Sequence, residues 1–282
     1  MRLIKDNGTE IFEFTSTTEV KNFSKGEKFK KQSADFFGEQ LGTWEQVQKR
    51  IDRDWAEGMY ILNKYLERIK KIKLPEIKSR KRKTTYSEHG GDEVDFDRLY
   101  AGLPFWRTTV REDSDGPPTI TVVVDTTTPY DEKVENILWR GAAAIALTEV
   151  LEQKGYAVEL WVVNGSKLYK GENTKVLTAC NLKKCSDPLD TSTLINTVAG
   201  WFYRAVIFTL LYTICDEQGK QPEYGLGRCT TPTQNNLDKL TTDANRVYIA
   251  GVFSFDGAMS VVQAELKNLA EKDTDKEESK VE

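Results

Sequence analysis

The chain has 282 residues, of which 39% are hydrophobic and 30% are charged, and its formal net charge is −4 at pH 7. This composition is typical of a globular protein that can bury a sizeable core. No apolar run reaches the roughly 18 residues of a membrane span, and the opening MRLIKDNGTE lacks the pattern of a signal peptide. We therefore expect a cytoplasmic protein with no membrane partner.

The cysteines show no metal-binding pattern. Cys180, Cys185, Cys215 and Cys229 contain no CxxC pair, and the single histidine, His89, cannot complete a common zinc set. We therefore expect reduced thiols.

The N-terminal part of the sequence predicts helices. Residues 1–42 have weak organisation, with at most a short strand or anchor at the apolar residues near position 12. Thr43–Gln46 is a capping box that predicts the start of a helix. A second amphipathic helix follows from Asp54 and must end before Pro75. We expect residues 43–116 to form a helical region and a basic linker.

Positive charge is concentrated between Arg68 and Lys83. This stretch holds nine basic residues and one acid, Glu76, a local balance of +8 that leaves −12 on the rest of the chain. Such a stretch can neutralise phosphates, and Tyr86 can stack on an unpaired base. The alternative is a solvated helix end and flexible linker. The candidate nucleic-acid-binding residues are Lys70, Lys71, Lys73, Lys78, Arg80, Lys81, Arg82, Lys83 and Tyr86.

The centre of the sequence predicts a strand, a crossover helix and a second strand. Thr119–Asp125 is almost entirely β-branched, as in a strand buried on both faces. Apolar residues recur at helical spacing from Val134, and Gly155 ends that helix. Tyr156–Val163 is again strand-like. This unit favours a parallel pair of strands, so we expect an α/β fold.

The next segments predict a hairpin and two helices. Asn164 and Gly165 indicate a turn, after which Thr174–Cys180 can pair antiparallel at the edge of the sheet. Leu194–Cys215 predicts two packed helices interrupted at Gly200. The Gly- and Pro-rich segment 216–245 predicts a loop.

The last predicted elements are a strand and a helix. Val247–Ser254 is the next buried strand, and Ala258–Leu269 is the closing helix. We place the α/β domain at residues 117–272. The acidic tail 273–282 has no apolar pattern, and we expect it to be disordered.

Several phrases resemble the von Willebrand factor A (VWA) fold. Asp125–Pro129 (DTTTP) follows the first buried strand, and Arg140–Tyr156 (RGAAAIALTEVLEQKGY) precedes VELWVV. Gly90–Trp106 is similar to the lead-in of an uncharacterised VWA-like family of tailed phages and some bacteria. Together these resemblances cover roughly Glu88–Leu269. They imply a three-layer, VWA/Rossmann-like, mostly parallel sheet with one antiparallel edge strand, preceded by a helical N-terminal region.

The VWA resemblance also implies a degenerate Mg²⁺ site. The family gathers an Asp and two hydroxyls from one phrase, a threonine from a second loop and an aspartate from a third. Pro129 stands at the third position of the first phrase and offers no ligand. Thr191 or Thr193 can stand for the second loop. The alternative is that the first carboxylate caps the following helix. The candidate metal ligands are Asp125, Thr127 and Asp256.

Binding is a better prediction than catalysis, because the sequence contains no phosphate loop and no G-x-S-x-G elbow. The resemblance to the phage family implies a non-enzymatic, phage-encoded accessory factor in the host cytoplasm that contacts nucleic acid, with single-stranded DNA favoured. It would recruit a transcription or replication partner such as a polymerase or ATPase. The alternatives are a VWA-type adaptor with a divalent-metal site and a structural virion component. Arg140 and Arg204 would add an anion contact only if both were exposed on one face.

Overall fold

A computed structural model provides the coordinates of the chain. It describes residues 1–70, 83–91, 93–110, 119–128, 132–223, 228–241, 245–250 and 252–278.

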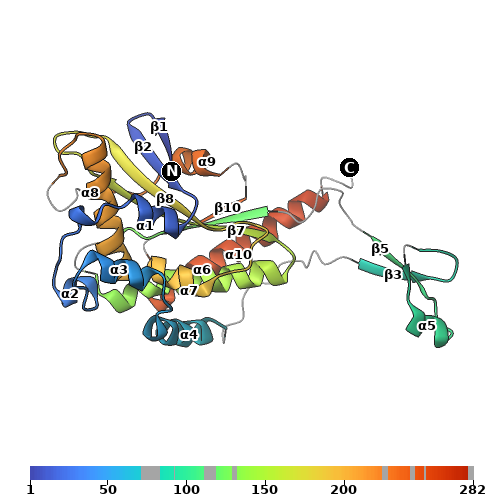
Figure 1. Cartoon of the computed structure of the whole chain (residues 1–282). Coiled ribbons are helices and arrows are strands. Elements are labelled where there is room, and N and C mark those ends of the chain that lie inside the picture. The colour runs from blue at the N-terminus through green and yellow to red at the C-terminus, as the bar shows by residue number, and fades with distance from the viewer. Residues whose placement is uncertain are drawn as a thin grey trace.

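The centre of the molecule is a mixed sheet in the order β1-β2-β8-β7-β6-β10, with the short β9 paired to β7 (Figure 1). Three of the five neighbouring pairs along this order, β2–β8, β7–β6 and β6–β10, are parallel. The predicted α/β class and mostly parallel pairing are therefore confirmed. The strands are β1 (Arg2–Asp6), β2 (Thr9–Phe14), β6 (Thr119–Asp125), β7 (Ala157–Lys167), β8 (Lys175–Lys183), β9 (Arg228–Cys229) and β10 (Arg246–Ile249).

The predicted strand–helix–strand unit forms the middle of this sheet. β6 and β7 are parallel, and α6 (Val134–Gln153) connects them. Gly155 follows α6 with a positive φ of 91°, which explains why the helix ends there. Gly141 lets α6 approach α7 (Thr191–Val198) closely, since a Cβ at this position would lie 2.6 Å from Cγ2 of Val198.

Residues 1–42 are better ordered than the sequence indicated. β1 and β2 form a hairpin in which Asn7 (φ 39°) and Gly8 (φ 76°) supply the two positive φ values of a type I′ turn. β2 then pairs in parallel with β8, with Ile11 opposite Leu177. The expectation of weak organisation missed this Asn-Gly signal, because a two-stranded hairpin gains stability only where a larger sheet accepts it.

Two predictions about the next hairpin need correction. β8 is antiparallel to β7, as expected, but Asn164 and Gly165 lie inside β7 and not in a turn. β8 is also not an edge strand, because β2 pairs with its other side. The turn dipeptide was misleading here because Gly165 serves close packing: a Cβ would lie 2.3 Å from the carbonyl oxygen of Thr230.

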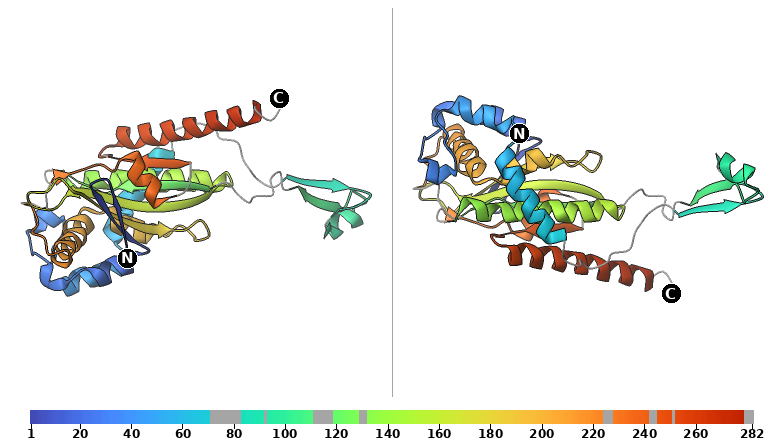
Figure 2. Two further views of the ribbon diagram at one scale, coloured as in Figure 1. Left: turned by 90° about the horizontal axis from the view of Figure 1, so that it is seen from above. Right: turned by 90° about the horizontal axis from the view of Figure 1, so that it is seen from below.

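Helices cover the two faces of the sheet unequally (Figures 1 and 2). α6, α7 and α8 pack with the large hydrophobic cluster on one face, whereas Leu237 and Leu240 of α9 join a smaller cluster on the other. α10 lies beside α6, as their contacts show. The remaining helices of the main body are α1 (Thr17–Phe23), α2 (Ala34–Phe37), α3 (Trp44–Ile51), α4 (Ala56–Lys70), α8 (Phe208–Glu217), α9 (Gln234–Leu240) and α10 (Phe255–Glu278), with a 3₁₀ turn at Gly26–Lys28.

The predicted N-terminal helices dock on the core. The capping box of Thr43 and Gln46 starts α3, as predicted. α4 packs on α6, where the rings of Tyr65 and Trp139 stack with centroids 3.7 Å apart. The division at residues 42, 116 and 272 stays a prediction, although contacts within the sheet cross the first of these boundaries.

The apolar stretch Leu194–Cys215 divides into two helical parts, as predicted. α7 ends at Val198, and a π-helix, η2 (Phe202–Ile207), then leads into α8. No single helix in the described ranges is both long and apolar enough to cross a membrane. By length and composition alone, the pair formed by α7 and Phe202–Glu217, bent by 64°, could do so.

The C-terminal helix is longer than predicted. Disorder was expected from residue 273, but α10 continues to Glu278. Ala, Glu and Lys favour helix even without an apolar stripe, and Lys267 pairs with Glu271 one turn later. Residues 279–282 lie outside the described residues.

A small second sheet lies apart from the main body (Figures 1 and 2). It comprises β3 (Lys83–Ser87), β4 (Glu93–Val94), α5 (Phe96–Tyr100) and β5 (Trp106–Val110), with β5 between the other two strands. We refer to residues 83–91 and 93–110 as the β-module.

Candidate functional site at the carboxyl edge of the main sheet

Asp125 ends β6 and is almost fully buried, with 3% of its surface exposed. Its Oδ1 accepts the backbone N–H of Thr127 at 2.8 Å, and its Oδ2 accepts the hydroxyl of Tyr248 at 2.6 Å. The alternative that Asp125 caps the following helix is wrong, because α6 begins at Val134 with Lys133 at its cap position. The carboxylate instead orders the loop that follows its own strand.

Arg140 of α6 donates hydrogen bonds to the same loop. Its Nη1 donates to the carbonyl oxygens of Asp125 at 2.6 Å and Thr127 at 3.1 Å, and its Nη2 donates to Oγ1 of Thr128 at 3.2 Å. The side chain is fully buried, and its guanidinium lies over the ring of Phe253. Burial lowers the pKa of Arg140 to about 10, while the nearby Asp125 opposes this change. The guanidinium is therefore protonated at neutral pH and acts as an internal cation.

Threonines attach this loop to β7. Thr126 donates both its backbone N–H and its hydroxyl to the carbonyl oxygen of Val163, at 2.7 and 3.1 Å. The backbone N–H of Gly165 donates to Oγ1 of Thr127 at 3.0 Å. The hydroxyl of Thr128 donates to the carbonyl oxygen of Thr126. We refer to Asp125–Thr128 as the β6 loop. Its hydrogen bonds to Arg140 and to β7 hold its backbone in place.

Three further side chains from distant segments complete the site. Tyr248 comes from β10, and the π-helix η2 supplies Tyr203, whose hydroxyl is bonded to Cys229 of β9. The thiol of Cys229 lies 3.9 Å from the carbonyl oxygen of Thr128. Burial raises the pKa of both tyrosines above the ordinary value. Cys229 raises the pKa of Tyr203 further, and Asp125 does the same for Tyr248. Both phenols are therefore neutral hydrogen-bond donors.

We did not group these residues from the sequence, although a signal existed for one of them. β-strand alternation could have placed Tyr248 on the same face as Asp125, because Tyr248 lies opposite Val123 in the parallel pair. Tyr203 and Cys229 had no such signal, since a π-helix and a two-residue strand bring them together.

The structure places two of the three candidate metal ligands in one loop and the third in a helix. Asp125 and Thr127 share the β6 loop, whereas Asp256 is exposed in the first turn of α10. Thr193 donates its hydroxyl to Asp190, which caps α7, and Thr191 is the first residue of that helix. Within the described ranges, no group of three or more His, Cys, Asp or Glu residues is placed to hold a metal ion.

Two features affect whether the β6 loop can hold a divalent cation. Coordination by Oδ2 of Asp125 would have to displace the Tyr248 hydroxyl. The buried charge of Arg140 would repel the incoming cation, and such repulsion is strong where water is excluded. Pro129 lies outside the described residues.

Arg140 and Arg204 do not form an anion-binding face. Arg140 is fully buried, and Arg204 is 5% exposed. Arg204 donates to the carbonyl oxygens of Phe36 at 2.7 Å and Glu132 at 2.9 Å. The packing interpretation of these two residues is thus the correct one.

The basic stretch connects the main body to the β-module. Lys70 is the last residue of α4, and Lys83 is the first residue of β3. Tyr86 is 38% exposed on β3, donates its hydroxyl to Asp95 at 3.3 Å and carries the guanidinium of Arg98 over its ring. One face of that ring is therefore already occupied. The other candidates, Lys71, Lys73, Lys78, Arg80, Lys81 and Arg82, lie outside the described residues.

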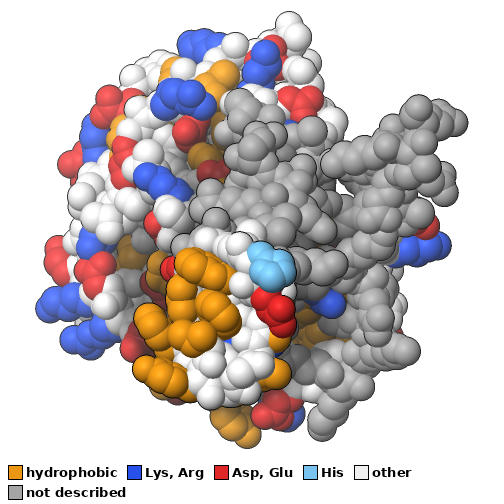
Figure 3. Space-filling model, turned by 90° about the vertical axis from the view of Figure 1, so that its right-hand side faces the viewer, with side chains coloured by type: hydrophobic (Ala, Val, Ile, Leu, Met, Phe, Trp, Pro, Cys, Tyr) orange, Lys and Arg blue, Asp and Glu red, His pale blue; other side chains and the backbone are white. Residues whose placement is uncertain are grey.

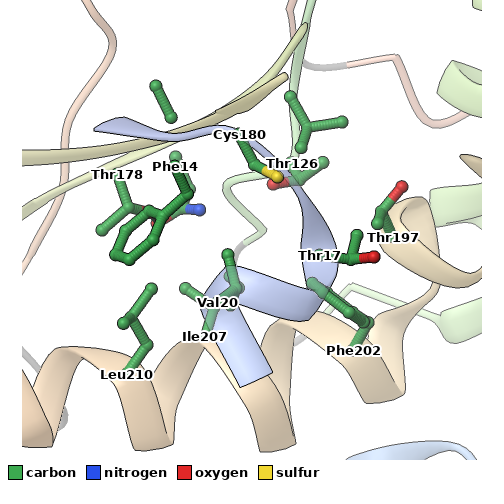
Figure 4. Close-up of a pocket in the computed structure, with 13 residues that line it drawn as sticks. Phe14, Thr17, Val20, Thr126, Thr178, Cys180, Thr197, Phe202, Ile207 and Leu210 are labelled. Atoms are coloured by element: carbon green, nitrogen blue, oxygen red, sulfur yellow. Dashed lines mark hydrogen bonds between the residues drawn. The ribbon is translucent and has the colours of Figure 1, made fainter. Parts of the chain in front are cut away.

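A small cavity lies beneath the β6 loop, between the sheet and η2 (Figure 4). Thr126, Asn164 and Thr178 contribute polar atoms to its lining, and Phe14 and Phe202 contribute apolar ones. The cavity volume is about 10 Å³, about the minimum that admits one water molecule. This cavity can hold a bridging water but not an organic ligand.

Comparison with known proteins defines a family. No curated protein and no solved structure matches the chain. The sequence model of one family, described as a domain of unknown function (DUF7192), matches residues 6–270. This match includes the main sheet from β2 to β10, the β6 loop and the β-module. Since the match covers most of the chain, the protein belongs to the DUF7192 family.

Proposed function

We propose that this protein is a non-enzymatic accessory factor that binds nucleic acid, with single-stranded DNA favoured, and recruits a protein of the replication or transcription machinery. The segregation of charge carries the proposal. Nine basic residues lie between Arg68 and Lys83 in a chain whose remainder carries −12. They join two folded parts, so a bound strand would lie between α4 and β3.

The resemblance to VWA domains supports the adaptor part of the proposal. β6, β7 and β10 are parallel, α6 is the crossover helix, and an Asp-x-Thr phrase follows β6. The resemblance of Gly90–Trp106 to the phage family supports a phage origin, a host-cytoplasmic location and a polymerase or ATPase as partner.

Fluorescence anisotropy tests nucleic-acid binding. Labelled single-stranded DNA, duplex DNA and single-stranded RNA are titrated with the full chain at several salt concentrations. We expect tightest binding to single-stranded DNA and a steep log–log dependence on salt. Reversal of Lys78, Lys81 and Lys83 to Glu removes up to three phosphate contacts, which lowers the salt slope by about 2 for a single strand.

A charge-matched control separates local from general effects. Lys170, Lys184 and Lys239 are exposed on the main body, and their reversal to Glu changes the net charge equally. We expect this variant to keep most of the wild-type affinity. Equal weakening by both triple variants, or no binding by the wild type at low salt, would refute the proposal.

A divalent-metal adaptor is the second candidate, because Asp125 and Thr127 share the β6 loop at a sheet edge suited to ligands. Calorimetric titration with Mg²⁺ tests it, with Asp125→Ala as the binding-deficient variant. Saturable binding that Asp125→Ala abolishes, while the fold is kept, would favour this candidate. Absence of binding by the wild type would eliminate Mg²⁺ from the site.

A further inference from the structure

The β-module exposes most of the large hydrophobic side chains that the structure leaves uncovered. Among the described residues, seven such side chains are exposed, and five of them lie in this module. Figure 3 shows hydrophobic side chains gathered on that side of the molecule. We refer to these five residues as the apolar patch. They are Tyr86, Phe96, Leu99, Tyr100 and Leu103.

Helix α5 turns its apolar side outward. Phe96, Leu99 and Tyr100 occupy positions i, i+3 and i+4 and therefore share one face of the helix. Their exposed fractions are 63%, 38% and 86%. A short amphipathic helix usually buries such a stripe against its own domain, whereas this stripe faces the solvent.

The helix is held rigidly in this orientation. Asp95 caps its start by accepting the N–H of Arg98 at 3.1 Å, and Nε of Arg98 donates to the carbonyl oxygen of Pro104 at 2.8 Å. Gly102, at φ 67°, ends the helix in a Schellman motif in which the N–H of Leu103 donates to the carbonyl oxygen of Arg98. A patch fixed in this way loses little conformational entropy when it binds.

We propose that the apolar patch is the contact surface of a homodimer, in which the β-modules of two copies pack face to face about a two-fold axis. A two-fold contact places the same patch against itself, and an apolar stripe is complementary to its own copy. The module stands clear of the main sheet, so two modules can meet without overlap of their main bodies (Figures 1 and 2).

The charge around the patch favours a protein partner over nucleic acid. Residues 88–97 contain five acids and no Lys or Arg, and such a surface repels phosphates. The same five acids would also repel the second copy. Within each copy, Arg107 pairs with Glu93, which reduces this repulsion.

The size of the patch sets the expected strength. With the exposed fractions given above and 48% for Leu103, the five side chains offer roughly 500 Å² per copy, or roughly 1,000 Å² for the pair. This total lies at the lower limit for a specific interface, so we expect a weak dimer that forms in the micromolar range. Burial of the apolar patch in a dimer would also stabilise the module, because a unit of this length is too small to build a hydrophobic core of its own.

Sedimentation velocity of the full chain, free of nucleic acid, tests the proposal. Concentrations from about 1 to about 100 µM bracket the dissociation constant expected for a weak dimer. We expect the wild type to shift from monomer to dimer mass over this range. The double variant Phe96→Ser/Tyr100→Ser should weaken association at least about tenfold. Tyr60→Ser is the matched control, because Tyr60 is 72% exposed on α4, outside the module.

Hydrogen–deuterium exchange of the wild type provides a test without substitutions. Protection of the α5 amides should increase with protein concentration, while that of the α4 amides should not. A wild type that stays monomeric, a dimer that persists unchanged in the double variant, or loss of the dimer in Tyr60→Ser would overturn the proposal. None of these outcomes depends on whether the basic stretch binds nucleic acid.

Discussion

At the carboxyl edge of the main sheet, polar side chains are buried and bonded to one another, whereas in the β-module apolar side chains face the solvent. Asp125, Arg140 and Tyr248 each have partners inside the protein. Tyr100, in contrast, is 86% exposed. The phrase that resembles a metal site is thus hydrogen-bonded within the main body, whereas the exposed apolar side chains lie in the β-module.

Substitution of Arg140 should have the largest effect. Arg140→Met leaves two backbone carbonyls and the Asp125 carboxylate without a buried cation, so we expect a loss of about 3–5 kcal/mol in the free energy of unfolding. Urea denaturation measures this loss. Arg53→Met, at an exposed arginine, should change stability by less than about 0.5 kcal/mol. If Arg140→Met also lost less than about 0.5 kcal/mol, the β6 loop would not depend on this residue.

Alkaline pH should destabilise the main body through groups buried in their neutral form. Burial raises the pKa of Cys215 to about 11 and that of Cys180 to about 12, and it raises the pKa of Tyr203 and Tyr248 as well. Between the ordinary pKa and the raised one, the folded chain keeps each proton whereas the unfolded chain loses it. The stabilisation is therefore fully present below the ordinary pKa values. It is lost as the pH rises above about 9 for the thiols and about 10 for the phenols, by about 1.4 kcal/mol per pH unit for each group.

Urea denaturation at several pH values between about 8 and 11 checks this dependence. Tyr248→Phe should reduce the slope above pH 10 by one proton. A slope in this variant equal to that of the wild type would mean that Tyr248 ionises alike in the folded and unfolded chains.

Tyr248→Phe should have a smaller effect at neutral pH. The change removes the hydroxyl that donates to Asp125 at 2.6 Å, a bond to a charged group worth about 1.5–3 kcal/mol. We expect a loss in the lower half of this range, because Asp125 keeps its bond to Thr127. Urea denaturation at pH 7 measures it. A neutral or stabilising outcome would remove Tyr248 from the bonded network.

Tyr100→Ser should have the smallest effect on stability. The side chain has no cover in the monomer, so we expect a change within about 0.5 kcal/mol at low protein concentration, measured by denaturation. Its effect should appear only in self-association. A large loss of stability in the monomer would indicate that the patch packs within its own chain, which would break the contrast between the two regions.

Local patterns were enough to predict the central elements. The β-branched run of β6, the periodicity of α6 and the capping box of α3 are each encoded within a few residues, and the structure contains all three. The sequence also indicated the α/β class, because a strand, helix and strand in succession favour parallel pairing. Charge composition likewise needs no fold, so the basic stretch was visible at once.

Long-range contacts were decided by the tertiary structure alone. The hairpin of β1 and β2 joins the sheet next to β8, more than 160 residues away along the chain. It pairs with the side of β8 that does not pair with β7. Arg140 and Tyr248 reach Asp125 across 15 and 123 residues. Spacing along the chain contains no information on such approaches, because they depend on how the sheet and its helices pack. For the same reason, the sequence predicted neither α5 nor the outward direction of its apolar stripe.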